Sequence, residues 1–385
     1  MKKLVMLCAL AAMPVLQSLA QEAIFSRHNI VSPEVNRDGS ITFRTAAPNA
    51  KQVEIQGDFL PDGHQPMTLQ DGVWTFTQKD KLPAELYSYR FSVDGVQQLD
   101  NANIRRSRDI TFFQNTFIVS HEKGDAGYLY DTHDVPHGTV TQAWYDSPTL
   151  GTTRRISIYT PAGYEKGGKY PVLYLLHGMG GDEEAWLELG RTAQILDNLI
   201  ALGKAEPMIV VMPNGHVENQ ASPYHRIDGQ QPKPKASHQE AFPDIQNYIA
   251  KNYRIKKGAD NTAICGLSMG GYHTFTISLM QPKTFGYIGL FSAAIRMTPG
   301  HNEPIEEQLA NSPEGVRQFE QLFAAKPHLY WIAIGKTDFL FEQNVGLRKY
   351  LDKKQYPYEY YESEGGHIWR NWRVYLSMFA QRLFK

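Results

Sequence analysis

A serine between two glycines is the feature of this sequence with the clearest chemical potential. Residues 266–270 read Gly-Leu-Ser-Met-Gly, which gives Ser268 the spacing Gly-x-Ser-x-Gly. The apolar run 262–265 precedes this motif, and a helix-like stretch follows it. A strand that turns sharply into a helix exposes the serine hydroxyl, and Gly266 and Gly270 are needed because strand and helix come too close for larger side chains. Ser268 is therefore the candidate nucleophile for acyl transfer.

A serine hydroxyl attacks only when a neighbouring base removes its proton, and after this kind of turn an acid and then a histidine follow along the chain. Three histidines come late enough: His301, His328 and His367. His301 has no predicted strand leading into it, and His328 precedes a strand, at its wrong end. His367 follows an apolar run and the flexible pair Gly365-Gly366, just before the last predicted helix. We therefore predict that His367 is the base.

The third group must be a carboxylate that orients the histidine. Asp338 lies just past the apolar run 329–334, at the carboxyl end of a predicted strand, where catalytic groups gather in open α/β sheets. Glu342, Glu362 and Glu364 are rivals, but the last two adjoin the strand of the histidine and cannot easily reach its ring. Asp338 is therefore the predicted acid.

An acyl-transfer site also needs backbone N–H groups that stabilise the negative charge of the tetrahedral intermediate. Met269, the residue after the serine, supplies the first of these oxyanion-hole donors. The run 177–181 reads His-Gly-Met-Gly-Gly and ends the apolar run 172–176, so a second donor is expected from Met179 or Gly178. His177 is interpreted as a support for this loop rather than as a second base.

The elements that must position these residues form an alternating series from residue 139 onward. Strand-like runs alternate with helix-like ones, which predicts a mostly parallel sheet with helices on both faces. The predicted strands span residues 155–159, 172–176, 208–212, 262–265, 288–291, 329–334 and 358–361. The predicted helices span about residues 182–202, 238–252, 271–280, 343–354 and 368–384. With the serine turn, this order predicts an α/β-hydrolase catalytic domain over residues 139–385.

A second pattern, with a period of two, occupies the region before that domain. Short alternating runs lie at 40–45, 52–56, 73–77, 87–93 and 115–119. The dipeptides Asp38-Gly39, Asp71-Gly72 and Asp94-Gly95 lie between or beside these runs and are typical of tight hairpins. We therefore predict a small all-β, immunoglobulin-like sandwich over residues 21–122. Residues 123–138 lack periodicity and are the expected linker; Pro136, between His133 and His137, argues against a helical zinc site there.

The first twenty residues have the order of a secretory signal peptide. Lys2 and Lys3 precede an apolar run, and small residues follow it at the spacing of a cleavage site before Gln21. The run is too short to cross a bilayer, so we expect a secreted or periplasmic protein with no membrane attachment after cleavage. Removal of this segment leaves Cys265 as the single cysteine, which excludes an internal disulfide in the mature chain.

Composition restricts the partners. The net charge is -1 with 21% charged residues, and no basic run is present. Proteins that bind nucleic acid or anionic membranes present clustered basic surfaces, so neither partner is expected.

The motifs together resemble a known family. Residues 154–186, the serine motif, the turn 335–338 and the run 365–369 are similar to the esterase D group, which includes the feruloyl and acetyl xylan esterases of carbohydrate esterase family one. The similarity covers nearly all of residues 140–385. Residues 29–120, with their Gly57-Asp58-Phe59 turn, resemble carbohydrate-binding module family 48.

The resemblance implies a serine esterase that needs no metal or other cofactor and acts on feruloylated or acetylated xylan-type polysaccharide or oligosaccharide. It places the nucleophile, acid and base of the family on the same Ser268, Asp338 and His367. The alternatives are a siderophore esterase acting on catecholate triesters and a non-catalytic glycan-binding protein. The expected substrate-binding residues, from their places beside the oxyanion loop, the base and a long polar loop, are Trp186, Trp369, Tyr224, His225 and Arg226.

Overall fold

The computed structural model describes residues 30–223, 234–297, 300 and 303–385. The expected signal peptide lies outside these residues, as do His301 and the expected substrate-binding residues Tyr224, His225 and Arg226. The chain divides into two compact units. The first comprises the described part of Met1–Gln56 with Leu60–Lys81 and Arg90–Ile104, and the second comprises Gly57–Phe59, Leu82–Tyr89 and Arg105–Lys385.

The N-terminal region is all β, as the alternating pattern predicts. One sheet has the order β1-β2-β6-β5, and a second has the order β4-β3-β7-β10-β9, with β8 paired to β7. Burial follows the period of two: in β3, Val53 and Ile55 are buried between less buried neighbours. The strands are β1 (Glu34–Val35), β2 (Ile41–Ala46), β3 (Val53–Gly57), β4 (His64–Pro66), β5 (Thr68–Gln70), β6 (Val73–Gln78), β7 (Glu85–Val93), β8 (Val96–Gln98), β9 (Arg106–Asp109) and β10 (Phe112–Val119).

Two of the Asp-Gly dipeptides form the hairpin turns expected of them. Asp71 and Gly72 have φ of 51° and 78°, and Asp94 and Gly95 have φ of 48° and 85°. Positive φ at both central residues gives a turn whose twist matches that of the strands, and this joins β5 to β6 and β7 to β8.

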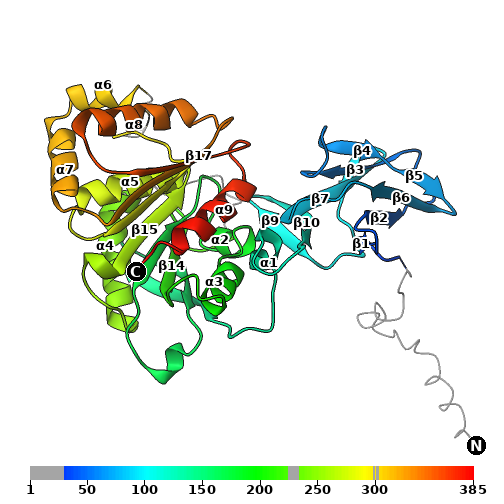
Figure 1. Ribbon diagram of the computed structural model, residues 1–385, viewed down its shortest axis with the longest axis horizontal. Coiled ribbons are helices and arrows are strands. Elements are labelled where there is room, and N and C mark those ends of the chain that lie inside the picture. Colours follow the sequence, from blue (N-terminus) through cyan, green and yellow to red (C-terminus); the bar gives the residue numbers. More distant parts are fainter. Residues whose placement is uncertain (1–29, 224–233, 298–299, 301–302) are drawn as a thin grey trace, which may run out of the picture. The chain divides into compact units, whose positions relative to one another are not determined.

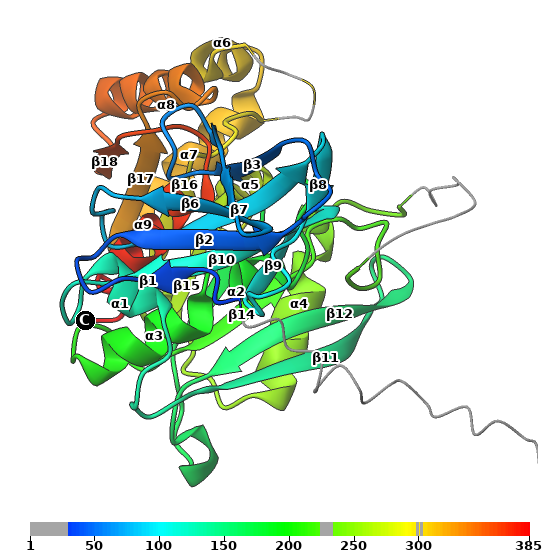
Figure 2. The ribbon, with the colours of Figure 1, turned by 90° about the vertical axis from the view of Figure 1, so that its right-hand side faces the viewer.

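The C-terminal region contains one sheet of eight strands in the order β11-β12-β14-β13-β15-β16-β17-β18. Figure 2 shows this succession from β11 and β12 to β17 and β18. The pairs β11/β12 and β12/β14 are antiparallel, and all later pairs are parallel. The strands are β11 (Thr139–Ser147), β12 (Thr152–Thr160), β13 (Val172–Leu176), β14 (Ile209–Pro213), β15 (Thr262–Leu267), β16 (Tyr287–Phe291), β17 (Leu329–Gly335) and β18 (Glu359–Ser363).

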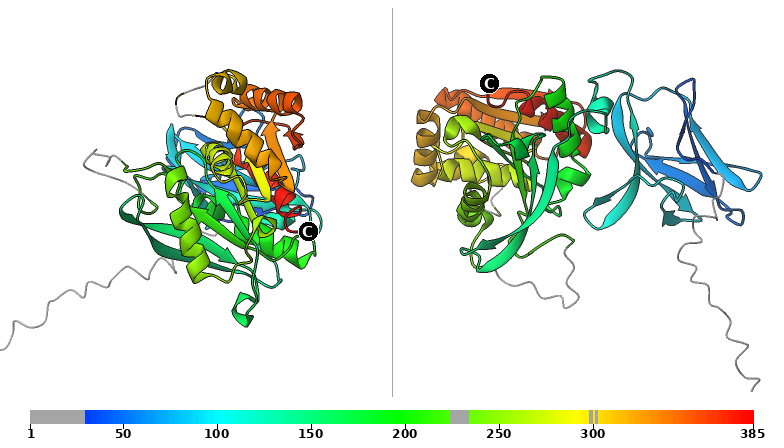
Figure 3. Two further views of the ribbon diagram at one scale, coloured as in Figure 1. Left: turned by 90° about the vertical axis from the view of Figure 1, so that its left-hand side faces the viewer. Right: turned by 90° about the horizontal axis from the view of Figure 1, so that it is seen from below.

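Helices cover both faces of this sheet (Figures 1 and 3), which confirms the predicted α/β-hydrolase class. Residues of α4 to α8 bury their apolar side chains in one cluster, and residues of α1, α2, α3 and α9 do so in another. The helices are α1 (Ala126–Tyr130), α2 (Ala185–Glu188), α3 (Thr192–Ala201), α4 (His238–Asn252), α5 (Met269–Met280), α6 (Ile305–Ala310), α7 (Pro313–Ala324), α8 (Phe341–Lys354) and α9 (Trp369–Ala380).

Several elements differ from the prediction for identifiable reasons. The expected helix 182–202 is two helices, α2 and α3, because Arg191 adopts a left-handed φ of 55° between them. The edge strand β11 was not predicted, since most of its residues are exposed and it lacks an apolar run. Within the expected linker, α1 buries Leu129 and Tyr130. No helix in the described part of the chain is long and apolar enough to span a bilayer.

Candidate active site

Ser268 occupies the sharp turn between β15 and α5. Its φ of 54° and ψ of -114° lie outside the ordinary regions for a residue with a side chain. Its N–H donates to the carbonyl of Phe291 at 3.0 Å, and its carbonyl accepts from Tyr272 and Ala294. The neighbouring glycines are required by space: a Cβ at Gly266 would lie 2.4 Å from the carbonyl oxygen of Gly270. The turn therefore holds the serine in a strained conformation that its neighbours enforce.

His367 and Asp338 form a hydrogen-bonded pair. The ring Nδ1 lies 3.0 Å from Oδ1 and 2.9 Å from Oδ2 of the carboxylate. Asp338 is buried and also accepts from the N–H of Leu340 at 2.9 Å, which fixes the carboxylate. A carboxylate only accepts, so Nδ1 of His367 carries hydrogen and Nε2 of the neutral ring is left to accept a proton.

The serine and the pair lie at the same edge of the sheet. Ser268 follows β15, Asp338 follows β17 and His367 follows β18, and these parallel strands all end at that edge. No hydrogen bond joins the hydroxyl of Ser268 to the ring of His367 among the described residues. Catalytic hydrogen bonds often form or tighten only when substrate is bound, so the absence of this bond does not rule out Ser268 and His367 as partners.

Three of the rival residues have other partners. His328 lies just before β17 and contacts Asp260 at 2.7 Å. Among the rival acids, Glu362 accepts from the hydroxyl of Tyr360 at 2.6 Å, and Glu364 pairs with the ammonium of Lys336. These contacts leave Asp338 as the described carboxylate that reaches the ring of His367.

The glycine-rich run 177–181, here called the oxyanion loop, lies against the nucleophile. A Cβ at Gly178 would lie 3.3 Å from the Cβ of Ser268. Within the described residues, the N–H groups of Met179 and Met269 have no hydrogen-bond partner in the protein. Two unpaired donors, one directly after the serine and one in the adjacent loop, are what a developing oxyanion needs.

Two histidines hold this loop. The ring of His177 bonds through Nδ1 to the carbonyl of Gly178 at 2.7 Å and accepts through Nε2 from the N–H of Gly215 at 2.7 Å. His216 accepts from the N–H of Gly180 at 3.1 Å. Burial lowers the pKa of His177 to about 4, so its ring is neutral at neutral pH. His177 is therefore a support of the loop, as the sequence indicated.

The two tryptophans expected to bind substrate are placed differently. Trp186 is only 1% exposed, and its Nε1 donates to the carbonyl of Leu176 at 3.0 Å. This burial corrects the expectation for Trp186, because its ring is part of the core and presents no face for stacking. Trp369 is half-buried and packs edge-on against Trp186, with 5.3 Å between ring centroids.

Sequence reasoning missed exposed apolar side chains on the segments that carry the candidate catalytic groups. The ring of Phe339, next to the acid, lies 4.5 Å from that of His367 and is 74% exposed. Ile368 and Met179 are also exposed, at 42% and 70%. The available signal was an aromatic residue, Phe339, directly after the predicted acid.

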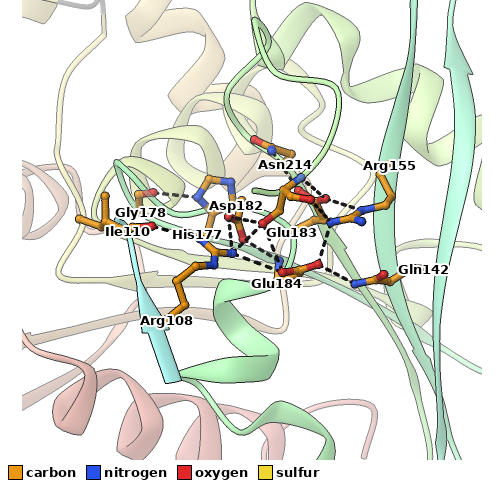
Figure 4. A network of polar contacts seen from close by, with 11 residues as sticks. Arg108, Ile110, Gln142, Arg155, His177, Gly178, Asp182, Glu183, Glu184 and Asn214 are labelled. Atoms are coloured by element: carbon orange, nitrogen blue, oxygen red, sulfur yellow. Dashed lines mark hydrogen bonds and ion pairs between the residues drawn. The ribbon is translucent and has the colours of Figure 1, made fainter. Parts of the chain in front are cut away.

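Sequence reasoning also missed a polar network behind the oxyanion loop (Figure 4). The consecutive acids Asp182, Glu183 and Glu184 follow that loop, and two arginines bind them. Arg155 donates to Glu183 and to Glu184, both at 2.7 Å, and Arg108 donates to Asp182 at 2.7 Å. The two arginines lie far from the acids in sequence, so no local pattern indicated the network.

The sequence matches two known protein families. Residues 147–383 match the family described as putative esterase, and residues 31–105 match carbohydrate-binding module 48, the isoamylase N-terminal domain. The arrangement has no group of three or more His, Cys, Asp or Glu side chains that could hold a metal ion within the described residues.

An endo-1,4-beta-xylanase/feruloyl esterase of Xylanibacter ruminicola is 30% identical over 364 residues, which cover 92% of this chain and 46% of that protein. An esterase of Mycobacterium tuberculosis is 26% identical and matches 59% of this chain and 56% of its own length. The chain therefore spans about half the length of these curated relatives.

Two solved structures are also similar. A ferulic acid esterase of the anaerobic fungus Anaeromyces mucronatus, in complex with ferulic acid, is 26% identical with a TM-score of 0.53; the match covers 67% of this chain and 94% of that one. The enterobactin esterase of Shigella flexneri is 18% identical with a TM-score of 0.59, and the match covers 95% of this chain and 98% of that one. At that identity the second likeness concerns the fold alone.

Proposed function

The chain belongs to the esterase family and is a carboxylic ester hydrolase, and from this premise we propose that it releases ferulate from plant cell-wall polysaccharide through Ser268, His367 and Asp338. The observation that carries the site assignment is the bond between Asp338 and Nδ1 of His367, at the sheet edge where the strained Ser268 lies.

The reaction follows from this geometry. Nε2 of His367 takes the hydroxyl proton as Oγ of Ser268 attacks the ester carbonyl. The N–H groups of Met269 and Met179 donate to the oxyanion of the tetrahedral intermediate, and Asp338 stabilises the imidazolium. As the tetrahedral intermediate collapses, the bond from the acyl carbon to the sugar oxygen breaks, and the imidazolium protonates that oxygen. The sugar leaves with a free hydroxyl, and the feruloyl group remains as an ester on Ser268. Water, deprotonated by His367, hydrolyses that ester and restores the serine.

Two observations support an aromatic acyl group. Phe339 against the ring of His367, Ile368 next to that histidine in the sequence and Met179 of the oxyanion loop are all exposed, and they offer apolar surface to a phenyl ring, which suits the mostly apolar character of small-molecule sites. The relative from Xylanibacter ruminicola and the fungal structure are both described as feruloyl or ferulic acid esterases. The same site also permits acetyl xylan esterase activity, which is part of the proposal.

The test compares the wild-type protein with Ser268→Ala on methyl ferulate, acetylated xylan and a catecholate triester. We expect wild-type turnover of methyl ferulate and a loss of about 10³-fold or more in the variant, because a serine-less site keeps only oxyanion and binding effects. Turnover of the catecholate triester alone would refute the polysaccharide substrate. Full turnover by the variant would refute the nucleophile assignment.

Export is also part of the proposal, and it rests on the sequence of residues 1–20 alone. N-terminal sequencing of the protein recovered outside the cytoplasm should begin at Gln21. An intact N-terminus on cytoplasmic protein would contradict export.

A further inference from the structure

The hairpin formed by β9 and β10 reaches the oxyanion loop, although it lies in the region predicted as part of the sandwich. Arg108 of β9 donates through one Nη2 to Oδ2 of Asp182 at 2.7 Å and to the hydroxyl of Ser222 at 2.6 Å. Asp182 directly follows the oxyanion loop and is 8% exposed. A charge-assisted bond between groups this sheltered is far less screened than a surface ion pair.

Arg108 joins two segments that border the candidate site. Ser222 belongs to the loop after β14, and its hydroxyl also donates to Asp182 at 2.6 Å. The hydroxyl therefore accepts from the guanidinium and has one hydrogen to donate, for which Asp182 is the nearer acceptor and Oε2 of Glu184, at 3.2 Å, is the farther one. Arg155 binds Glu183 and Glu184 from the side of β12 and makes no hydrogen bond to Asp182 within the described structure. Among the described arginines, Arg108 is thus the one that holds this first acid of the run.

The tip of the same hairpin touches the oxyanion loop directly. Ile110 has a φ of 52°, and a β-branched residue rarely adopts this left-handed conformation. A Cβ at Gly180 would lie 2.9 Å from Cδ1 of Ile110, so the isoleucine side chain covers the backbone of Gly180. Nη1 of Arg108 donates to the carbonyl of Ile110 at 3.2 Å and so supports the strained residue (Figure 4).

We propose that Arg108 and Ile110 are positioning residues for ester hydrolysis: Arg108 anchors Asp182 at the end of the oxyanion loop, and Ile110 covers Gly180 within it. The inference deepens the proposed function and rests on it. Neither residue needs to touch substrate. Together they fix the peptide that carries the N–H of Met179, whose neighbour Gly178 lies against Ser268.

The expected effect follows from what the loop does. Loss of a whole oxyanion donor lowers kcat by about 10²–10³-fold, and a loosened donor should cost less, about tenfold to a hundredfold. The donor acts on the transition state rather than on the bound ester, so KM for a small ester such as methyl ferulate should change by less than about threefold.

The first experiment measures kcat and KM of Arg108→Ala on methyl ferulate, with Arg105→Ala as the matched control. Arg105 precedes the same strand and pairs with Asp131 at 3.2 Å, with its own side chain 53% exposed. We expect a lower kcat in the Arg108 variant alone. Added guanidinium, at concentrations that do not unfold the protein, should restore part of kcat. Arg108→Lys should be intermediate, because an ammonium cannot reproduce the fork that reaches several acceptors.

The second experiment uses Ile110→Gly, which separates positioning from stability. Glycine adopts positive φ without strain, so the free energy of unfolding should stay equal or rise while the cover over Gly180 is lost. We expect kcat to fall with unchanged or higher stability. A purely structural role predicts no loss of kcat in a variant that is as stable as the wild type.

The outcomes distinguish this inference from the proposed function. Wild-type kcat in both Arg108→Ala and Ile110→Gly, with Ser268→Ala inactive, would overturn the positioning role and leave the esterase assignment intact. If Arg108→Ala does not fold, Arg108→Lys and Ile110→Gly decide the question. An inactive wild-type protein would refute the proposed function itself.

Discussion

The chemistry of the candidate site depends on one tautomer of His367. Its Nδ1 faces both carboxylate oxygens of Asp338, and the carboxylate is fixed further by the N–H of Leu340. This arrangement leaves the free lone pair of the neutral ring on Nε2, the nitrogen that does not face the acid. Asp338 therefore contributes orientation and charge together.

The substitution Asp338→Asn should remove these contributions to catalysis without unfolding the protein. The amide oxygen can still accept from Leu340, but its NH₂ group donates to the histidine and selects the wrong tautomer. We expect kcat on methyl ferulate to fall by about 10³–10⁴-fold, following the general behaviour of serine triads. Thermal unfolding of the variant should remain cooperative.

The control is Asp260→Asn, which alters a different His-Asp contact of the C-terminal region. Asp260 contacts His328 at 2.7 Å, but its side chain is 81% exposed and lies away from the sheet edge of the candidate site. The kcat of the Asp260→Asn variant should equal that of the wild type. Equal losses in the two variants would argue against a special role for Asp338.

At the scale of elements, the junction of β15 and α5 is the tightest packing around the nucleophile. A Cβ at Gly270 would lie 2.4 Å from the carbonyl oxygen of Leu176 in β13 and 2.5 Å from that of His177. Backbone atoms cannot yield as a flexible side chain does. Helix α5 thus begins directly on the strand ends, and this approach determines where Ser268 lies.

Gly270→Ala should therefore destabilise the protein, while the same substitution in an open helix should not. Gly346 of α8 has nothing within 4 Å of its Cβ position, so Gly346→Ala should raise the free energy of unfolding by about 0.5–1 kcal/mol. Gly270→Ala should lower it by about 1–3 kcal/mol, the cost of overpacking, and should also lower kcat. Chemical denaturation of both variants measures their free energies of unfolding. Equal changes in the two variants would contradict the packing argument.

At the scale of the whole molecule, buried histidines link folding to pH. Burial lowers the pKa of His177 to about 4 and of His273 to about 3, and it lowers the pKa of His238 well below its usual value, with His273 adding to the shift. The unfolded chain binds protons at these residues near pH 6.5, whereas the folded chain does not. Their contribution to stability is thus fully present above about pH 6.5 and is lost as pH falls toward 4.

We expect the free energy of unfolding to decrease between pH 6.5 and 4 by on the order of 1 kcal/mol per pH unit for each of His177 and His273, and His238 should add to the decrease. His238→Leu should make this dependence shallower. Both ring nitrogens of His238 are buried without a partner within the described structure, so the variant should keep its stability at pH 7. Urea denaturation at several pH values measures both effects. An unchanged slope in the variant would contradict the assignment of His238.

The sequence by itself determined the fold class and the elements whose signals are local. Helix α4 begins and ends where predicted, at His238 and Asn252, because Ser237 and Glu240 form a capping box at its start. Local signals also led to Ser268 and to the strand ends that carry Asp338 and His367. The serine motif, the period of the apolar runs and the order of residues along the chain can all be read from the sequence.

Tertiary structure alone decided the contacts between distant segments. Arg108 and Asp182 are 74 residues apart, and nothing near either residue indicates the other. Likewise, the buried position of Trp186 depends on Trp369 and Phe291 from other elements, not on its own neighbours. Periodicity and turn chemistry report what a residue does within its own element. Which side chains meet across elements depends on how the sheet and its covering segments pack, because burial and ion pairing are properties of that packing.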